Sequence, residues 1–245
     1  MLSFKLFGIP VGVHATFLFI ALLGAMSYRG WDIAFWTAAA FVSILAHEMG
    51  HALVASGFGA QGVSVTLYGL GGVTTYTHAG AMAPWKSFII SGAGSAVGIA
   101  LGGTLWLAVR SGVFDSVGPE AMVFINSLVF TSLVWGILNW IPIVPLDGGH
   151  MVQSFISIFS PKRAPLISQI ITWIAVAVIV PFAWTSGYRF GVIIVVMFAF
   201  SGLREYRQQA ARSKPRVDRT PEVRQPQPYP PAPPTPPKPP PEFPI

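Results

Sequence analysis

The sequence predicts an all-α polytopic membrane protein: about six transmembrane helices, with a small membrane-associated β-hairpin after the second. Composition is the first reason, because 53% of the 245 residues are hydrophobic and only 10% are charged, a balance typical of chains that cross a bilayer repeatedly. The second reason is that apolar residues fall into runs of about 20, the length at which a helix spans the hydrocarbon. The third is one short alternating stretch flanked by glycines, a pattern typical of paired strands.

Six apolar runs are expected to form the spanning helices. The first follows a single lysine, but no small-residue cleavage site follows it, so we expect a retained helix and not a signal peptide. The third contains many small residues, which let membrane helices approach closely. A short interfacial helix is expected over residues 150–159. The six expected spans cover residues 13–27, 33–55, 88–109, 122–141, 166–184 and 190–203.

Residues 63–76 break the helical pattern. Alternating β-branched residues at 63–68, a glycine-rich turn and a second short run predict two paired strands. An unpaired strand edge here would bind an extended peptide by strand addition, whereas a hairpin that only caps the helices is an equally open alternative. If the edge binds a peptide, five residues are expected to contact the substrate: Val65, Thr66, Leu67, Gly71 and Gly72.

The C-terminal part differs in composition from the rest, which predicts an apolar helical membrane domain over residues 1–203 and a basic, proline-rich cytoplasmic tail over residues 204–245. Fourteen of the 31 residues from Pro215 onward are proline, so we expect disorder or polyproline II. Such a tail recruits a partner with a proline-binding groove or stays solvated without one, and the second reading is favoured.

Charge and cysteine content bound the function and the topology. Eight of the fifteen Lys and Arg residues lie from Arg204 onward, so the net charge of +6 is mostly a property of the tail. The charge indicates a cytoplasmic flank and not a nucleic-acid partner. We therefore expect a multi-pass protein of the cell membrane with both termini in the cytoplasm. The absence of cysteine excludes thiolate ligands, so any metal must be held by nitrogen and oxygen.

The candidate chemistry centres on His47-Glu48-Met49-Gly50-His51, inside the second apolar run. Histidines four apart on a helix project from one face at a spacing that suits a single metal ion. Glu48 between them can reach a water on that metal. Ionisable groups at membrane depth are costly, so this cluster indicates function.

Asp147 is the natural third ligand. Of the five acids before residue 204, three lie in polar connections, and only Glu48 and Asp147 fall within or beside the apolar segments. A catalytic zinc usually takes three protein ligands and leaves a fourth position for water. The sequence therefore predicts one zinc ion held by His47, His51 and Asp147, with Glu48 as general base.

Two further functions remain as alternatives to hydrolysis. Buried histidine and aspartate can line the path of a membrane metal-ion transporter, although no second ring of polar groups marks such a path here. The other alternative is a catalytically inactive relative that only binds membrane proteins. The presence of all four polar residues, His47, Glu48, His51 and Asp147, argues against it.

These residues resemble the site-2 proteases, a family of intramembrane zinc metalloproteases. The resemblance covers roughly residues 9–159 and rests on two motifs together: His47-Glu48-Met49-Gly50-His51-Ala52, and Asn139-x-x-Pro142-x-x-Pro145-Leu146-Asp147-Gly148-Gly149. Gly71-Gly72-Val73 after a strand is also similar to the family. Many members have Gly-Pro and a following Asn where this chain has Gly94 and Ser95, a difference that we expect to affect packing more than chemistry.

The resemblance implies a six-helix core of minimal type, without PDZ or CBS domains, whose zinc is reached by water from the cytoplasm. It implies regulated cleavage of a transmembrane protein substrate within the lipid bilayer, often an anchored transcription factor or its inhibitor. By the same resemblance, Asn139 would orient the substrate backbone near the scissile bond.

Overall fold

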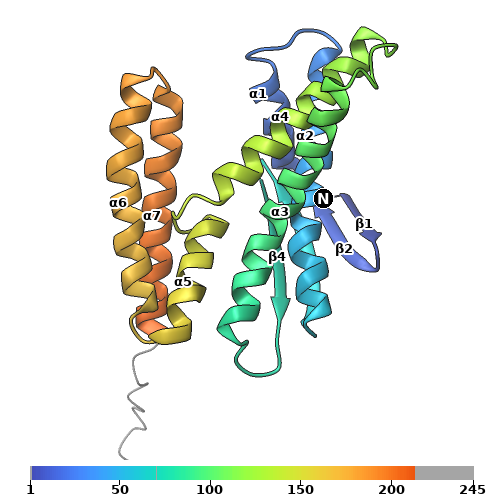
Figure 1. Cartoon of the computed structure of the whole chain (residues 1–245). Coiled ribbons are helices and arrows are strands. Elements are labelled where there is room, and N and C mark those ends of the chain that lie inside the picture. The colour runs from blue at the N-terminus through green and yellow to red at the C-terminus, as the bar shows by residue number, and fades with distance from the viewer. Residues whose placement is uncertain (1, 70, 213–245) are drawn as a thin grey trace, which may run out of the picture.

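The computed structural model describes residues 2–69 and 71–212 of the chain (Figure 1). Helices dominate, and a small sheet lies beside them. In chain order the elements are β1 (Leu2–Leu6), β2 (Ile9–Val13), the 3-10 helix η1 (Ala15–Leu18), α1 (Phe19–Gly24), α2 (Asp32–Gly57), β3 (Gln61–Tyr68), β4 (Gly71–Thr77), α3 (Pro84–Arg110), α4 (Pro119–Asn139), α5 (Asp147–Phe159), α6 (Ala164–Thr185) and α7 (Arg189–Arg212). The tail predicted to be disordered lies, from residue 213 onward, outside the described residues.

Four of the six expected spans are confirmed as helices long and apolar enough to cross a membrane: α2, α3, α4 and α6. α7 has 24 residues, but its apolar stretch ends at Arg204, where charged residues begin. It also continues to Arg212, past the domain boundary expected at residue 203. The expected six spans are therefore confirmed in part.

The first expected helix is much shorter than the sequence suggests. β2 continues to Val13, and only the ten residues Ala15–Gly24 are helical. Ten helical residues are about 15 Å long, half of what a bilayer requires. The preceding residues form a β1–β2 hairpin, whose turn at Phe7 and Gly8 has positive φ angles of 48° and 81°. This hairpin was not expected from the sequence.

The hairpin predicted over residues 63–76 is confirmed as β3 and β4, which pair antiparallel. It belongs, however, to a four-stranded sheet in the order β1-β2-β3-β4. β2 pairs in parallel with β3, from Val11 opposite Val65 to Val13 opposite Leu67. The expectation of an unpaired edge at Val65, Thr66 and Leu67 is therefore wrong, since that stretch has a neighbour on both sides. Among the described strands, the outer edges belong to β1 and β4.

α2, which carries the two histidines of the sequence motif, is a central helix that contacts α3, α4, β3 and β4. The close packing expected from small residues in the third span is confirmed. A Cβ added at Gly98 of α3 would lie 3.2 Å from the Ser132 carbonyl oxygen of α4, and one at Gly50 of α2 would lie 2.9 Å from the Ala93 carbonyl oxygen of α3. Glycines thus let α2 and α4 approach the backbone of α3.

The chain between α4 and α5 is irregular, as the two prolines predict. α4 ends at Asn139, and α5 begins at Asp147 after a cis peptide bond between Val144 and Pro145. A side chain at Gly148 would collide with the Trp140 carbonyl, so only glycine lets this segment fold back on the end of α4. The consequence is that Asp147 stands at the first residue of a helix that packs on α3.

α6 and α7 form an antiparallel pair that stands to one side of the other helices, with α5 between (Figure 1). Their contact with the rest includes the loop before Asp147. The Val144 backbone N–H donates to Thr172 Oγ1 at 3.1 Å, and Gly202 lies against the Val144 carbonyl.

Candidate metal centre

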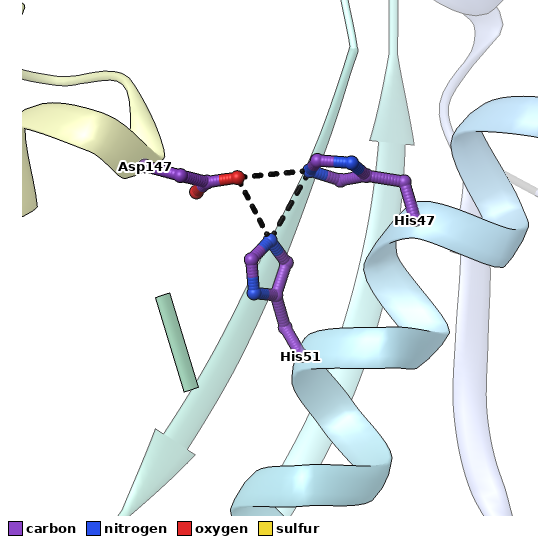
Figure 2. Close-up of side chains that lie close together, drawn as sticks. All are labelled: His47, His51 and Asp147. Carbon is purple, nitrogen blue, oxygen red and sulfur yellow. Dashed lines mark hydrogen bonds and ion pairs between the residues drawn. The ribbon is translucent and has the colours of Figure 1, made fainter. Parts of the chain in front are cut away.

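Three side chains from two distant segments converge on one point. His47 and His51 project from the same face of α2, one turn apart, and Asp147 approaches from the start of α5 (Figure 2). Asp147 Oδ2 lies 3.1 Å from His47 Nε2 and 3.2 Å from His51 Nε2, and the two Nε2 atoms are 3.1 Å apart. Both histidines are buried, and the Asp147 side chain is 19% exposed. The three residues predicted as ligands are thus together.

Neighbouring groups fix the orientation of two of the three. His51 Nδ1 lies 2.6 Å from the Ile90 carbonyl oxygen. A carbonyl can only accept, so Nδ1 carries the proton and Nε2 presents its lone pair toward His47 and Asp147. Ser95, fully buried on α3, donates its hydroxyl to Asp147 Oδ2 at 3.2 Å. Such partners hold metal ligands in place in many proteins.

α3 must approach the histidines closely to supply these contacts. A Cβ added at Gly94 would collide with the His51 ring and would lie 2.7 Å from the His47 carbonyl oxygen. The Gly94-Ser95 pair therefore has two roles: the glycine admits the imidazole, and the serine contacts the carboxylate. Gly94 and Ser95 are the positions at which this chain differs from many site-2 proteases. Because both contact the metal-centre residues, this difference concerns the site as well as helix packing.

The geometry and chemistry of this triangle fit a divalent metal ion. Ligand atoms about 2 Å from a tetrahedral ion lie about 3.3 Å from one another, close to the separations of 3.1–3.2 Å found here. The unprotonated Nε2 of His51 and the Asp147 carboxylate both offer lone pairs to the same space. A cation between the three groups would satisfy them together.

Electrostatics favour the ligating form of the carboxylate. Burial alone would raise the pKa of Asp147, but the imidazoles of His47 and His51 beside it bring that pKa below its ordinary value. Asp147 is therefore ionised at neutral pH, as a hard anionic ligand must be.

Glu48 is buried beside the triangle and is held by β4. Thr74 Oγ1 donates to Glu48 Oε2 at 2.7 Å and lies 3.1 Å from the Glu48 backbone oxygen. A Cβ added at Gly72 would collide with Glu48 Cγ and lie 2.8 Å from Oε1. Gly72, predicted to contact substrate, thus makes room for the glutamate side chain.

A cavity of about 630 Å³ opens in front of the triangle. Glu48, His51 and Asp147 line it, together with hydroxyl-bearing and amide side chains of α3 and α5. Burial raises the pKa of Tyr76, which also lines the cavity, so its hydroxyl stays protonated and can donate a hydrogen bond. The polar wall consists of Ser87, Ser91, Gln153, Ser154 and Ser157.

The other residues singled out in the sequence lie in different places. Asn139 is the last residue of α4 and is not among the residues that line the cavity. Val65 and Leu67 are buried in the sheet, and Gly71 begins β4. His150, three residues after Asp147 on α5, lines the cavity as well, and the hydroxyl that donates to the Asp147 carboxylate is that of Ser95.

Sequence reasoning missed Thr74 and Tyr76. Both lie on the same face of β4 as Gly72, because alternate residues of a strand point the same way, and the pattern of burial along β4 agrees. Counting every second residue along the strand from Gly72 would have identified Thr74 and Tyr76. Ser95 was noticed only as a departure from the family pattern, since nothing in the sequence pairs it with Asp147.

Comparisons with known proteins agree with this site. Residues 115–182, which include Asp147, match Peptidase family M50. A putative zinc metalloprotease of Synechocystis is 29% identical over 194 residues, covering 71% of this chain and 50% of the relative. A zinc metalloprotease of Methanocaldococcus jannaschii is 30% identical over 166 residues, covering 63% and 44%. The chain spans about half the length of these two relatives.

A solved structure extends the likeness to the fold. The site-2 protease from Methanocaldococcus jannaschii superposes with a TM-score of 0.61 at 23% identity, over 84% of this chain and 95% of that one. The resemblance to the site-2 proteases is thereby confirmed: the chain contains a Peptidase family M50 region and has the fold of a site-2 protease.

Proposed function

We propose that this chain is a zinc endopeptidase that hydrolyses a peptide bond within or near a transmembrane segment of a protein substrate. The observation that carries the proposal is the triangle of His47, His51 and Asp147 with the Glu48 carboxylate beside it. The zinc metalloproteases among its relatives support the choice of metal and reaction.

The residues divide the chemistry between them. His47, His51 and Asp147 would hold one zinc ion, which when bound supplies a Lewis acid and lowers the pKa of a coordinated water. Glu48 accepts a proton from the attacking water and passes it to the leaving amine. The Tyr76 hydroxyl, protonated and facing the same cavity, can donate to the substrate backbone.

A substrate helix must unwind before its carbonyl can be attacked, because its backbone hydrogen bonds bury that carbonyl. The outer edge of β4 can hold the unwound segment extended and replace the lost hydrogen bonds. The substrate would therefore pair with β4 and not with residues 63–68. Residues of β4 line the cavity, and the outer side of this strand has no neighbouring strand among the described residues. Gly71 then belongs to the substrate-binding strand, and Asn139 keeps only the role implied by the family.

Both ends of α3 have the side chains of a membrane interface, and the charge of the tail is the reason for choosing between the two orientations. Near its start, Lys86 Nζ lies 5.4 Å from the Phe58 ring centroid, and at its end Arg110 Cζ lies 5.4 Å from that of Trp106. Cationic and aromatic side chains gather at membrane interfaces. We place the Lys86 end in the cytoplasm, so that the metal centre lies in the cytoplasmic half of α2, in the cell membrane.

The decisive experiment has two stages. Membrane proteomes of cells that carry the intact chain or Glu48→Gln are compared, and proteins shortened only with the intact chain become candidate substrates. A candidate is then incubated with the purified protein before and after zinc removal and restoration. We expect cleavage that requires both zinc and Glu48. Cleavage that persists in the Glu48→Gln protein, or zinc binding without cleavage of any membrane protein, would contradict the proposal.

The substrate sequence gives a further check on strand binding. Glycine, proline or asparagine near the cut weakens a helix, so such substrates should be cleaved faster than leucine- or alanine-rich versions. Prolines placed singly along β4 should slow cleavage in folded, zinc-loaded protein. If none of them does, β4 only caps the helices.

A further inference from the structure

We propose that Thr74 is the positioning residue of the general base, and that β4 thereby couples substrate binding to the orientation of Glu48. This inference rests on the proposed function of the same site. It starts from one contact: the Thr74 hydroxyl donates to Glu48 Oε2 at 2.7 Å, with the Glu48 backbone oxygen at 3.1 Å as a second acceptor.

The contact distinguishes the two carboxylate oxygens. Oε2 is held by Thr74, whereas Oε1 accepts no hydrogen bond from the described residues and lies on the side of Gly72. Glu48 also lines the cavity, so Oε1 is the oxygen left to face an attacking water. A carboxylate held at one oxygen and free at the other has the geometry that a general base needs.

The strand itself does not require a hydroxyl at position 74. Valine and threonine are both β-branched and both favour strands, so Thr74→Val would preserve the shape and the local preference. What valine lacks is the hydroxyl that satisfies a buried carboxylate oxygen, and hydrogen bonds to charged groups are stronger than neutral ones. The hydroxyl is therefore the part that calls for a functional explanation.

The next residue provides a matched control. Thr75 lies on the opposite, exposed face of β4, where its Oγ1 is 2.8 Å from Ser64 Oγ of β3. It has the same side chain, the same strand and a hydrogen bond of similar length, but no contact with the metal centre.

The position of Thr74 makes the coupling direct. β4 offers the outer edge to which an extended substrate would pair, and the side chain of Thr74 joins the backbone of this strand to the base. A substrate that orders β4 would order the Glu48 carboxylate at the same time. An empty edge leaves both less constrained.

The test uses three variants of the full chain: Thr74→Val, Thr74→Ser and Thr75→Val. With a cleavable substrate, Thr74→Val should lower kcat about 10- to 100-fold, a fraction of the contribution typical of a general base. KM and bound zinc should stay unchanged, and Thr74→Ser should recover most of kcat. Thr75→Val alters the substrate strand only on its opposite face, so it should leave kcat unchanged even if KM shifts. A raised KM with kcat unchanged, loss of zinc, or an equal effect of Thr75→Val would overturn the proposal.

A second measurement does not depend on activity. Thr74→Val should lower the Tm of the zinc-loaded protein, and the same substitution should have little effect in a Glu48→Ala background, because the hydrogen-bond partner is already gone. Equal shifts in both backgrounds would show that Thr74 does not hold Glu48. If the unsubstituted chain cleaves nothing, the proposed function fails, and this thermal cycle still decides on the contact itself.

Discussion

Two apolar regions of the molecule differ in how far their helices are enclosed: α2, which carries the two histidines of the metal centre, and the α6–α7 pair. In α2, 61% of the apolar window is buried inside the protein, against 28% in α6 and likewise 28% in α3 and α4, which pack around α2. α6 exposes Ile170, Ile174, Val178 and Phe182, which recur every fourth residue and so form one stripe along the helix. This stripe is suited to contact with lipid.

The difference shows where a membrane protein can place ionisable groups. α2 is surrounded by α3, α4 and the sheet, so its ionisable side chains meet protein partners: His51 contacts the Ile90 carbonyl of α3, and Glu48 accepts from Thr74 of β4. A helix facing lipid has no such partners to offer, and unsatisfied polar groups there are costly. Hydrophobicity alone therefore identifies both regions as membrane segments, and only the polar interruptions identify the site.

Removing a metal ligand should separate the two regions most strongly. His47→Ala or Asp147→Ala should abolish zinc binding and cleavage, whereas Glu48→Gln should keep zinc and lose cleavage. Ile174→Ala in the lipid-facing stripe should change neither. Zinc analysis of the purified variants checks this, and full occupancy in Asp147→Ala would remove Asp147 from the ligand set.

Adding one methyl group next to the base should have the next largest effect. In Gly72→Ala the new Cβ would collide with Glu48 Cγ and displace the carboxylate, so we expect a loss of cleavage of about 100-fold or more with zinc retained. Gly103→Ala on α3 is the control, because an added Cβ there meets nothing within 4 Å. The kcat of both variants is measured with one substrate. Equal activities would show that Glu48 tolerates displacement.

Removing a hydroxyl that contacts a ligand should have a smaller effect. Ser95→Ala deletes the donor to Asp147 Oδ2, and loss of such a partner typically weakens metal binding about 10- to 100-fold. Ser168→Ala on α6 is the matched control, since Ser168 Oγ is buried with no hydrogen-bond partner among the described residues. Competition with a zinc chelator measures both affinities. An unchanged affinity in Ser95→Ala would make its contact incidental.

Deleting residues 215–245 should have the smallest effect of all. Sequence so rich in proline buries little apolar surface, so Tm and cleavage of a purified substrate should match those of the full chain. A lower Tm or a lost activity would mean that the tail belongs to the folded domain.

The chemistry of the site could be predicted further than the fold around it. His47, Glu48 and His51 lie on one helix, so helical spacing alone brings them together. Asp147 was found because acids are scarce in apolar sequence. Thr74 and Ser95 were missed as partners of Glu48 and Asp147 because these contacts join residues 26 and 52 positions apart. A local sequence pattern does not indicate contacts between such distant residues.

The errors in the fold come from the N-terminus and have the same cause. The sequence pattern places Val13 at the start of an apolar run and residues 9–12 in no element, but residues 11–13 pair with β3, more than 50 residues later. Strand pairing is non-local, so the sequence could predict the β3–β4 hairpin, with its short turn, but not the β2–β3 pairing. Because of this pairing, residues 65–67 lie in the interior of the sheet and not at its edge.

The contact of α6 and α7 with Val144 gives the lipid-facing pair a mechanical link to the metal. Thr172 accepts a hydrogen bond from the Val144 N–H, Gly202 lies against the Val144 carbonyl, and Asp147 follows three residues later. Membrane helices tilt in response to bilayer thickness. A tilt of this pair would pull on the loop that carries the third ligand, so we expect metal affinity to vary with the acyl-chain length of the surrounding lipid.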